Sequence, residues 1–438
     1  MLWLLNVVYA GVLTCLSPVI LWRMLRHGRF RRGLTQKLFG SLPVTTGRVP
    51  VIWFHAVSVG EVLQLQKVVA EFRDADLDGR RILITTSTDT GYDLAVERFS
   101  DCTVSWFPLD FSWAVNRALD RVQPELVVLT ELEFWPGFLM ACGRRNIKTA
   151  VINARMSDRS FRGYQRVGFL LRPLLSQFSV VAAQSAEYAE RLTALGVRPE
   201  CTTVTGSIKF DGVATDRSNE PTSALRSLLN VDHDDMILVA GSTQSPEEDM
   251  VIRAWKELRS DYPRLRLIGV PRHRERFDSV ATLLAGGHTE FIRRSTLASS
   301  PQTIPHDTVI LLDTIGELAA CWGLADLAFV GGTFGTRGGQ NMLEPAAYGA
   351  AVLFGPNTWN FRDIVRMLLA EQAAVEINSP SDFAGQLKTL LDDDLRRNAL
   401  GHAARNLVLA QQGAIQQTIQ LLMTAVNSAD TTPRRSAA

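Results

Sequence analysis

The fold is indicated most directly by the stretch Val330-Gly-Gly-Thr-Phe-Gly-Thr-Arg-Gly-Gly-Gln-Asn-Met-Leu-Glu-Pro345. The apolar residues 327–330 predict a buried strand, five glycines follow, and a helix is expected to open near Asn341. Glycine lets backbone N–H groups approach an anion closely, and the free N–H groups of a helix start favour phosphate. The carboxylate of Glu344, just inside that helix, is suited to accept hydrogen bonds from a ribose. An ordinary strand-to-helix turn is the alternative, because a glycine-rich turn alone is weak evidence.

The same order of an apolar run and then a polar cluster recurs in both halves of the chain. Apolar runs occur at residues 51–57, 81–84, 126–129, 150–152, 237–240, 265–270 and 309–312. Their alternation with helical stretches is typical of parallel sheets that are covered on both faces. Ligands of such sheets bind beyond the carboxyl ends of the strands, where the polar residues fall. We therefore expect an α/β protein with two doubly wound, Rossmann-like domains facing a cleft.

Length and composition agree with a cytosolic protein of this kind. The chain has 438 residues, enough for two or three domains with sizeable cores. Lys plus Arg number 46 and Asp plus Glu 45, so the net charge gives no argument for a nucleic-acid partner. The five cysteines lie far apart and form no CxxC pair, which disfavours a disulfide framework and a zinc site. This cysteine usage is most consistent with a reducing compartment.

The N-terminus predicts a membrane anchor. Residues 2–22 are uncharged and mostly apolar, which is long enough for a helix to span a bilayer. A signal peptide is the competing interpretation, but no basic region precedes the apolar run and no convincing cleavage site follows it. The basic residues that come next are Arg23, Arg26, Arg29, Arg31, Arg32 and Lys37. By the positive-inside rule they predict that the body of the protein lies in the cytoplasm, and they are suited to contact anionic lipids.

The polar residues 212–223 break the alternation and predict a linker between the two domains. The expected organisation is a membrane anchor with a basic juxtamembrane segment at 1–38, a first Rossmann-like domain at 39–211 and a second at 224–426. Residues 427–438 are expected to be a disordered tail.

A set of motifs spread over most of the chain resembles one known family. The motifs are Ser58-Val-Gly-Glu61, Glu131-Leu-Glu-Phe-Trp-Pro136, Gly206-Ser-Ile-Lys-Phe-Asp211, Gly241-Ser-Thr243, Pro271-Arg-His273, Asp313-Thr-Ile-Gly-Glu-Leu318 and Arg337-Gly-Gly-Gln-Asn-Met-Leu-Glu-Pro345. In this order they resemble the Kdo transferases of lipopolysaccharide synthesis, where Kdo is 3-deoxy-D-manno-oct-2-ulosonic acid. The resemblance implies a GT-B fold, with CMP-Kdo as donor and a lipid A precursor, lipid IVA, as acceptor. It also implies action at the cytoplasmic face of the inner membrane, in contact with its lipids, without a cofactor.

The resemblance assigns catalysis to three residues in the first domain. Glu61 is implied as the general base, because an acceptor hydroxyl attacks better when a carboxylate takes its proton. Glu131 and Lys209 are implied to assist the transition state, where the leaving phosphate gains negative charge that fixed donors stabilise. A helix-start carboxylate is the alternative for Glu61. A surface salt bridge is the alternative for Glu131 and its neighbour Glu133, and a solvated loop lysine for Lys209.

The same resemblance places the CMP contacts in the second domain. The implied contacts are Pro271, Arg272, Ile315, Gly316, Glu317, Asn341, Met342, Leu343 and Glu344. Arg272 offers a bidentate fork for phosphate or carboxylate, and an ion pair with Glu275 is its alternative. Backbone groups of 315–317 are suited to contact the cytosine edge, whereas Glu317 alone also fits a helix-start carboxylate.

Three positions depart from the family pattern. Gln340 stands where the family usually has His, Leu132 where Thr usually separates the two acids, and Ser207 where Asn is common. None of them removes an implied catalytic group. Gln340 does put in doubt any role that needs an imidazole there.

Three other functions compete with Kdo transfer. Another membrane-associated GT-B glycosyltransferase, using a UDP-sugar, is the main alternative. A non-catalytic nucleotide-binding protein would not need Glu61, Glu131 and Lys209 together. The glycine stretch does not fit the GxGxxG pattern of NAD enzymes and lies too late in the chain. Asp232-His-Asp-Asp235 resembles a metal-binding DxD signature, but it precedes a predicted strand and better fits an Asp-rich turn, so no catalytic metal is expected.

Overall fold

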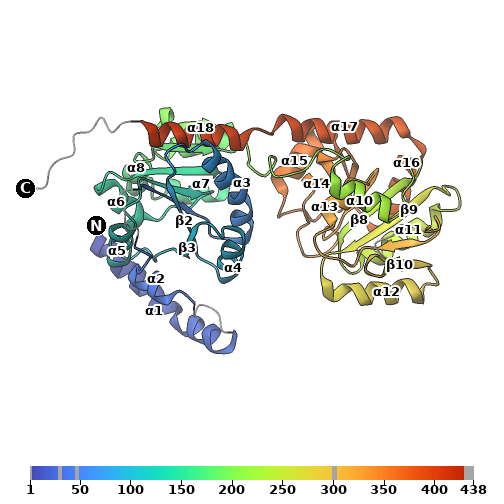
Figure 1. The fold of residues 1–438 in the computed structure, drawn as a ribbon, viewed down its shortest axis with the longest axis horizontal. Helices are drawn as coiled ribbons and strands as arrows, with labels where there is room; N and C mark the ends of the chain where they lie inside the picture. Colours follow the sequence, from blue (N-terminus) through green and yellow to red (C-terminus); the bar gives the residue numbers. More distant parts are fainter. Residues whose placement is uncertain (1, 28–31, 45–48, 298–302, 429–438) are drawn as a thin grey trace, which may run out of the picture. The chain divides into compact units, whose positions relative to one another are not determined.

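The computed structural model describes residues 2–27, 32–44, 49–297 and 303–428. The chain folds into two compact units, Met1–Gly212 with Gln412–Ala438 and Val213–Gln411 (Figure 1). Each unit contains a seven-stranded sheet whose paired strands are all parallel. The prediction of two parallel-sheet α/β domains is therefore confirmed.

The sheet of the first unit has the strand order β3-β2-β1-β4-β5-β6-β7. Its strands are β1 Val51–His55, β2 Arg81–Thr86, β3 Thr103–Trp106, β4 Leu126–Thr130, β5 Lys148–Ala154, β6 Val180–Ala183 and β7 Thr202–Val204. Side chains of β1 alternate between two cores, with Trp53 on one face of the sheet and Phe54 on the other. Burial on both faces explains why this strand reads as a continuous apolar run.

The helices of this unit are α1 Leu2–His27, α2 Leu34–Phe39, α3 Val59–Ala75, α4 Asp89–Arg98, α5 Ser112–Val122, α6 Pro136–Arg144, α7 Asp158–Gln165, α8 Gly168–Leu175, α9 Ala186–Ala194 and α18 Ala414–Asn427. Residues of α5 and α6 lie in the core on one face of the sheet, and residues of α3 and α18 lie in the core on the other face. Chain order reverses between the neighbouring strands β1 and β4, because β1 leads to β2 on one side and β4 to β5 on the other. Parallel sheets bind ligands in the crevice beyond the strand ends at such a point.

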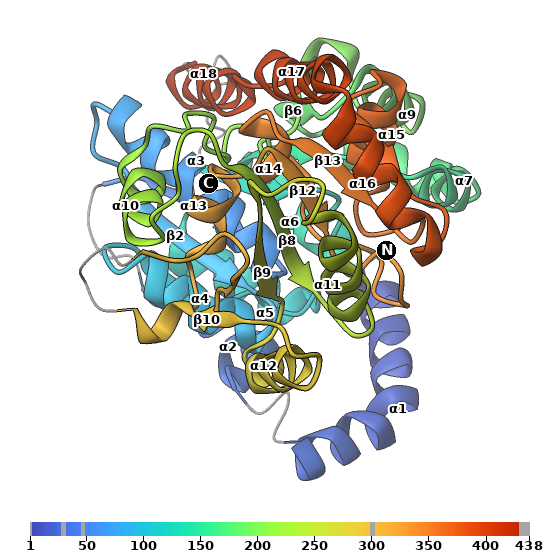
Figure 2. The same ribbon diagram turned by 90° about the vertical axis from the view of Figure 1, so that its right-hand side faces the viewer.

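The second unit repeats this plan with the strand order β10-β11-β9-β8-β12-β13-β14 (Figure 2). Its strands are β8 Met236–Thr243, β9 Leu265–Pro271, β10 Phe291–Arg293, β11 Val309–Leu311, β12 Leu327–Val330, β13 Ala351–Phe354 and β14 Ala374–Glu376. Its helices are α10 Glu220–Leu228, α11 Glu247–Leu258, α12 Phe277–Gly286, α13 Leu318–Trp322, α14 Leu343–Ala347, α15 Arg362–Ala370, α16 Phe383–Asp392 and α17 Asp394–Ala410. Here the chain order reverses between β8 and β12, so a ligand crevice of this sheet is expected beside the glycine stretch.

The last helix belongs to the first unit, although the sequence placed residues 224–426 together in the second domain. Ile415, Ile419 and Leu422 of α18 pack in the same core as Phe54. Asp211 accepts hydrogen bonds from the backbone N–H groups of Gly413 and Ile415, each at 2.6 Å. The chain therefore crosses between the units twice, near residue 212 and near residue 411. The apolar stripe of α18 gave no sign in the sequence of which core would bury it.

Polar contacts fasten the N-terminal helix α1 to the first unit. The Asn6 amide donates to Ser112 Oγ at 2.7 Å and accepts from the Ser112 N–H at 2.9 Å. Tyr9 donates its hydroxyl hydrogen to Asp110 at 2.8 Å. Among the helices that the structure describes, none is both long and apolar enough to cross a bilayer, so the predicted anchor is not confirmed. Arg29, Arg31 and the predicted tail beyond residue 428 lie outside the described residues.

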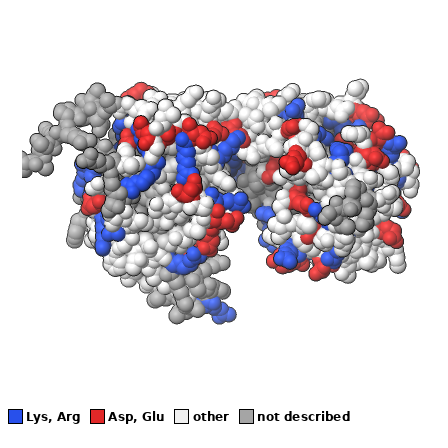
Figure 3. Space-filling view, viewed as in Figure 1, with Lys and Arg blue, Asp and Glu red and all other residues white. Residues whose placement is uncertain are grey.

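The distribution of surface charge agrees with the balanced composition. Basic and acidic side chains are interspersed over the face of the molecule in Figure 3. Among the residues described on that face, Lys and Arg do not gather into one broad basic field.

Candidate active site

Glu61 lies in the first turn of α3, directly after the carboxyl end of β1. Its carboxylate accepts a hydrogen bond from the Val57 N–H at 2.9 Å and another from the Ser58 hydroxyl at 2.8 Å. Ser58 Oγ in turn accepts from the Glu61 N–H at 3.4 Å, which makes the pair a reciprocal helix cap. Glu61 is thus a helix-start carboxylate, and it also stands at the β1–β4 reversal where a ligand crevice is expected.

Two further carboxylates follow β4, the other strand at this reversal. Glu131 has a positive φ of 61° and accepts a hydrogen bond from Arg155 Nε at 2.9 Å. Glu133 accepts a hydrogen bond from the indole N–H of Trp135 at 2.9 Å. The salt bridge that the sequence left open for Glu131 is therefore present. Its partner, Arg155, directly follows β5, the strand next to β4 in the sheet.

Glu61, Glu131 and Glu133 form an acidic cluster, in which burial and the charges of neighbouring acids raise the pKa values of Glu61 and Glu133. Burial raises the pKa of Glu133 to about 7, and the charge of Glu61 contributes to the rise. Burial also raises the pKa of Glu61, with the charge of Glu131 adding to it and the bonds from Val57 and Ser58 opposing it. A carboxylate that holds a proton nearer to neutral pH is a better general base than an ordinary glutamate. The sequence pointed to Glu61 and Glu131, named Glu133 only as the neighbour of Glu131, and gave no measure of their burial.

Asn153 brings the segment of Lys209 to the same edge of the sheet. Asn153 is the penultimate residue of β5, has a positive φ of 53° and is fully buried. Its Oδ1 accepts hydrogen bonds from the Ser207 hydroxyl and the Ile208 N–H at 3.4 and 3.3 Å, and its Nδ2 donates to Gln64 of α3 at 2.8 Å. The turn that carries Lys209 is therefore tied to the helix that carries Glu61. No local motif reveals this role of Asn153, because Ser207 lies 54 residues later in the chain.

In the second unit, Arg272 follows β9 and is held at two points. Its backbone N–H donates to the carbonyl of Thr243 at 3.0 Å, and its Nε donates to Gln340 Oε1 at 3.0 Å. The side chain is exposed and forms no ion pair with Glu275 or any other described residue. Gln340, one of the three residues that depart from the family pattern, thus orients the guanidinium of Arg272. The terminal nitrogens of Arg272 remain available to an anion.

Asn341 and Glu344 lie together at the start of α14, as predicted. Asn341 donates to Glu344 Oε1 at 3.0 Å and accepts from the Leu343 N–H at 3.1 Å. Burial raises the pKa of Glu344, while the bond from Asn341 and the charge of Arg272 act in the opposite direction. Met342 and Leu343 are 0% and 2% exposed, so their side chains belong to the core and only their backbones are available to a ligand.

The segment 315–317 forms an exposed turn before α13. Ile315 is 77% exposed, and Gly316 has a positive φ of 93° that a residue with a side chain rarely adopts. Glu317 accepts hydrogen bonds from Arg294 at 2.8 Å and from the Thr314 hydroxyl. These contacts fix the Glu317 carboxylate, so backbone groups and the Ile315 side chain form the accessible part of the turn.

Comparison with known proteins identifies the family. Residues 28–212 match the family described as 3-deoxy-D-manno-octulosonic-acid transferase (kdotransferase). A 3-deoxy-D-manno-octulosonic acid transferase of Haemophilus influenzae is 34% identical over 94% of this chain and 97% of its own. The enzyme of the same name from Bordetella pertussis is 33% identical over 95% of this chain and 98% of its own. The chain belongs to the Kdo transferase family. It is therefore a glycosyltransferase.

Likeness to solved structures supports the fold of this transferase. A UDP-GlcNAc 2-epimerase from Neisseria meningitidis superposes with a TM-score of 0.55, covering 86% of this chain and all of its own at 10% identity. At such low identity the likeness concerns the fold alone. It agrees with two parallel-sheet domains that resemble GT-B glycosyltransferases.

The glycine stretch of the transferase differs from the sequence prediction in one respect. The sequence predicted that backbone N–H groups of this stretch can approach an anion of the ligand, with an ordinary strand-to-helix turn as the alternative. In the structure the N–H groups of Gly332, Thr333 and Phe334 all donate to the buried carboxylate of Glu247, at distances from 2.7 to 3.0 Å. Glu247 lies 85 to 87 residues earlier in the chain, so no local motif revealed this contact.

The Asp-rich turn lies at the amino end of β8, on the side opposite to the implied donor site. Ligand atoms of Asp232, Asp235 and His306 lie within 4.8 Å of one another. Asp235 already accepts hydrogen bonds from Arg266 at 3.1 Å and pairs with His306 at 2.7 Å. The buried guanidinium competes with any cation for this carboxylate. The absence of a catalytic metal stays a prediction.

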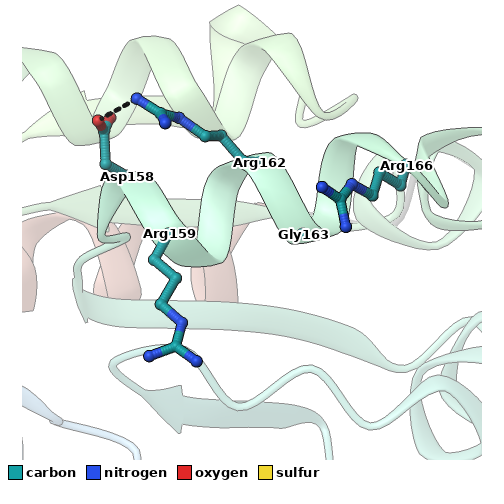
Figure 4. A pocket seen from close by; sticks show the side chains of 5 residues that line it. All are labelled: Asp158, Arg159, Arg162, Gly163 and Arg166. Carbon is teal, nitrogen blue, oxygen red and sulfur yellow. Dashed lines mark hydrogen bonds and ion pairs between the residues drawn. The ribbon is translucent and has the colours of Figure 1, made fainter.

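A surface hollow beside α7 is lined by Asp158, Arg159, Arg162, Gly163 and Arg166 (Figure 4). Arg162 donates to Asp158 at 3.1 Å, and the three guanidinium groups point in different directions. They do not converge on one anion. The hollow contains none of the residues that the family resemblance implicates in the reaction.

Proposed function

We propose that this transferase moves Kdo from CMP-Kdo to lipid IVA, with Glu61 as the general base. The observation that carries this proposal is the acidic cluster at the β1–β4 reversal, where burial and like charge raise the pKa of Glu61. Family membership supports the transferred sugar, because the relatives from two organisms bear the name 3-deoxy-D-manno-octulosonic acid transferase.

The reaction is a direct displacement at C2 of Kdo. The acceptor hydroxyl oxygen forms the new bond to C2 while its proton passes to the Glu61 carboxylate. The bond between C2 and the phosphate oxygen breaks, and CMP departs with the electron pair. One bond forms opposite the bond that breaks, so the configuration at C2 inverts. Lys209 is proposed to stabilise the charge on the leaving phosphate, as fixed cations do in such transition states. Glu131, bound to Arg155, is proposed to support the positive charge that develops at the sugar.

Donor binding is proposed for the second unit. Arg272, oriented by Gln340, offers two terminal nitrogens to an anionic group of the donor. The joined side chains of Asn341 and Glu344 are suited to bind the ribose hydroxyls. Backbone groups of 315–317 would contact the cytosine edge, with Pro271 and the backbone of 342–343 completing the site.

Association with the inner membrane is proposed to occur through α1. This helix exposes a series of apolar side chains, Val7, Val12, Leu16, Val19 and Trp22, each between 48% and 53% exposed. Exposed apolar residues followed by Arg26, Arg32 and Lys37 suit an interface with anionic lipids on the cytoplasmic side.

The decisive experiment incubates the purified protein with CMP-Kdo and a tetra-acylated lipid A precursor and follows the lipid by mass spectrometry. Addition of one or more Kdo units is expected. Competition of CMP and UDP for the site tests the UDP-sugar alternative, since a CMP-sugar enzyme should bind CMP more tightly. An unmodified lipid together with tighter binding of UDP would refute the proposal.

A further inference from the structure

Glu247 is a buried carboxylate whose bonds all go to backbone amides. It is the first residue of α11 and is 2% exposed. Oε2 accepts from the N–H groups of Gln244 at 3.0 Å and Gly332 at 2.7 Å. Oε1 accepts from those of Thr333 at 2.8 Å and Phe334 at 3.0 Å. Successive amides that point at one anion form an anion-binding nest, and here the anion is part of the protein itself.

The nest lies at the β8–β12 reversal of the second sheet, where backbones of the two strand ends are in close contact. A Cβ on Gly331 would lie 2.6 Å from Thr243 Cα, so only glycine fits there. The Gly331 N–H also donates to the carbonyl of Gly241 at 2.9 Å. Glu247 thus bridges the segment after β8 and the segment after β12 at the point where an α/β sheet normally binds its ligand.

A continuous set of bonds leads from this nest to the implied donor residues. The carbonyl of Gly332 accepts from the N–H of Gly339 at 2.9 Å, which places Gln340 beside it. Gln340 accepts from Arg272 Nε at 3.0 Å. The backbone N–H of Arg272 donates to the carbonyl of Thr243 at 3.0 Å, which completes the set. Moving the loop that Glu247 holds would therefore move the side chain that orients Arg272.

We propose that Glu247 is a positioning residue of the donor site, and this rests on the proposed function. Its carboxylate fills the anion nest of residues 332–334, so the anionic groups of the donor are excluded from these amides. The same negative charge fixes the loop that presents Gln340 and, through it, Arg272. The anionic groups of the donor are then bound by side chains, and the glycine stretch holds those side chains in position.

The first test is Glu247→Gln, measured as the dissociation constant for CMP and as kcat and KM with CMP-Kdo. A carboxamide accepts through one oxygen only, so its NH₂ group faces two of the four N–H donors and the loop must shift. CMP binding and the KM for CMP-Kdo are expected to weaken about tenfold, the equivalent of one lost buried bond. The KM for the lipid acceptor should not change.

Glu248→Gln is the matched control. Glu248 is the next residue of α11 and is 5% exposed, but its carboxylate accepts from Arg276 at 3.2 Å, whereas the amides of 332–334 donate to Glu247. This variant should bind CMP as the wild type does. The proposal would be overturned if CMP binding weakened equally in both variants. It would also be overturned if Glu247→Gln had a lower melting temperature but bound CMP as the wild type does. A wild type that fails to bind CMP would refute the proposed function instead.

Chemical rescue separates the carboxylate from the rest of the side chain. Glu247→Ala removes a carboxymethyl group, and acetate has the same size and charge. Acetate is expected to restore CMP affinity in this variant, whereas chloride at the same ionic strength is not. Equal effects of acetate and chloride would show that a carboxylate in the nest is not what holds the site. If the Ala variant does not fold, amide hydrogen exchange of residues 332–334 is compared between Glu247→Gln and the wild type. Faster exchange is expected in the variant, and unchanged protection would contradict the proposal.

Discussion

At the scale of single residues, the catalytic prediction concerns Glu61. Glu61→Gln keeps the acceptor that binds the Val57 N–H and can still pair with Ser58, so α3 should start normally. Loss of the base should lower kcat for Kdo transfer by about 10² to 10⁴-fold, the usual contribution of a general base. CMP binding serves as the control and should not change. Transfer at the wild-type rate would rule out this role.

Glu133 makes a second prediction, for the dependence of stability on pH. Its pKa in the folded protein is about 7, above the ordinary value of 4.5, so the protonated form is the one that the fold favours. The contribution of protonated Glu133 to the free energy of unfolding is fully present below pH 4.5 and is lost as pH rises through 7. Glu133→Gln, which is always neutral, should therefore be more stable than the wild type at pH 8. The difference should be about 1 kcal/mol once solvent screening of a partly exposed group is allowed for.

Thermal unfolding at pH 5 and pH 8 measures this effect. The advantage of Glu133→Gln should grow between the two values. The exposed Glu97, 67% accessible, provides the control as Glu97→Gln and should show no such trend. A variant that is less stable than the wild type at both pH values would contradict the raised pKa.

At the scale of elements, the sequence predicted strands better than it predicted which core each helix joins. Runs such as 51–57 and 126–129 became β1 and β4 because side chains on both faces of a parallel strand are buried. The short strands β3, β6, β7, β10, β13 and β14 were not among the expected runs, although β6 and β13 are equally apolar. Periodicity in a short run does not separate a strand from a piece of buried helix.

The attachment of α18 gives a prediction at this scale. Asp211 binds the backbone N–H groups at the start of α18, where a carboxylate also meets the positive end of the helix. Asp211→Ala should lower the free energy of unfolding of the first unit by about 1 to 2 kcal/mol. Denaturant unfolding checks this, with the exposed Asp74→Ala on α3 as the control. Equal stability of both variants would show that α18 does not depend on this cap.

At the scale of the whole molecule, membrane association is tested with vesicles of phosphatidylethanolamine and phosphatidylglycerol. Replacing Leu16 and Trp22 of α1 together with Ser removes two large exposed apolar side chains. Vesicle binding measured by sedimentation should fall roughly tenfold or more, because each buried CH₂ contributes about 0.8 kcal/mol. Ser at the exposed Leu77 and Leu395, which lie outside α1, is the matched control. Unchanged binding in the α1 variant would refute the proposed role of this helix.

The order of residues along the chain was enough to predict the alternation of buried strands and helices, the polar clusters that follow the strands, and the family. These properties are local, since they depend on neighbouring residues and on the order of motifs. The folded chain was needed to show that Glu247 accepts from the amides of residues 332–334, that α18 joins the first core, and that burial, together with the charges of neighbouring acids, raises the pKa values of Glu61 and Glu133. Each of these depends on groups that are distant in the chain and on the loss of solvent around them, which arises only when the chain is folded.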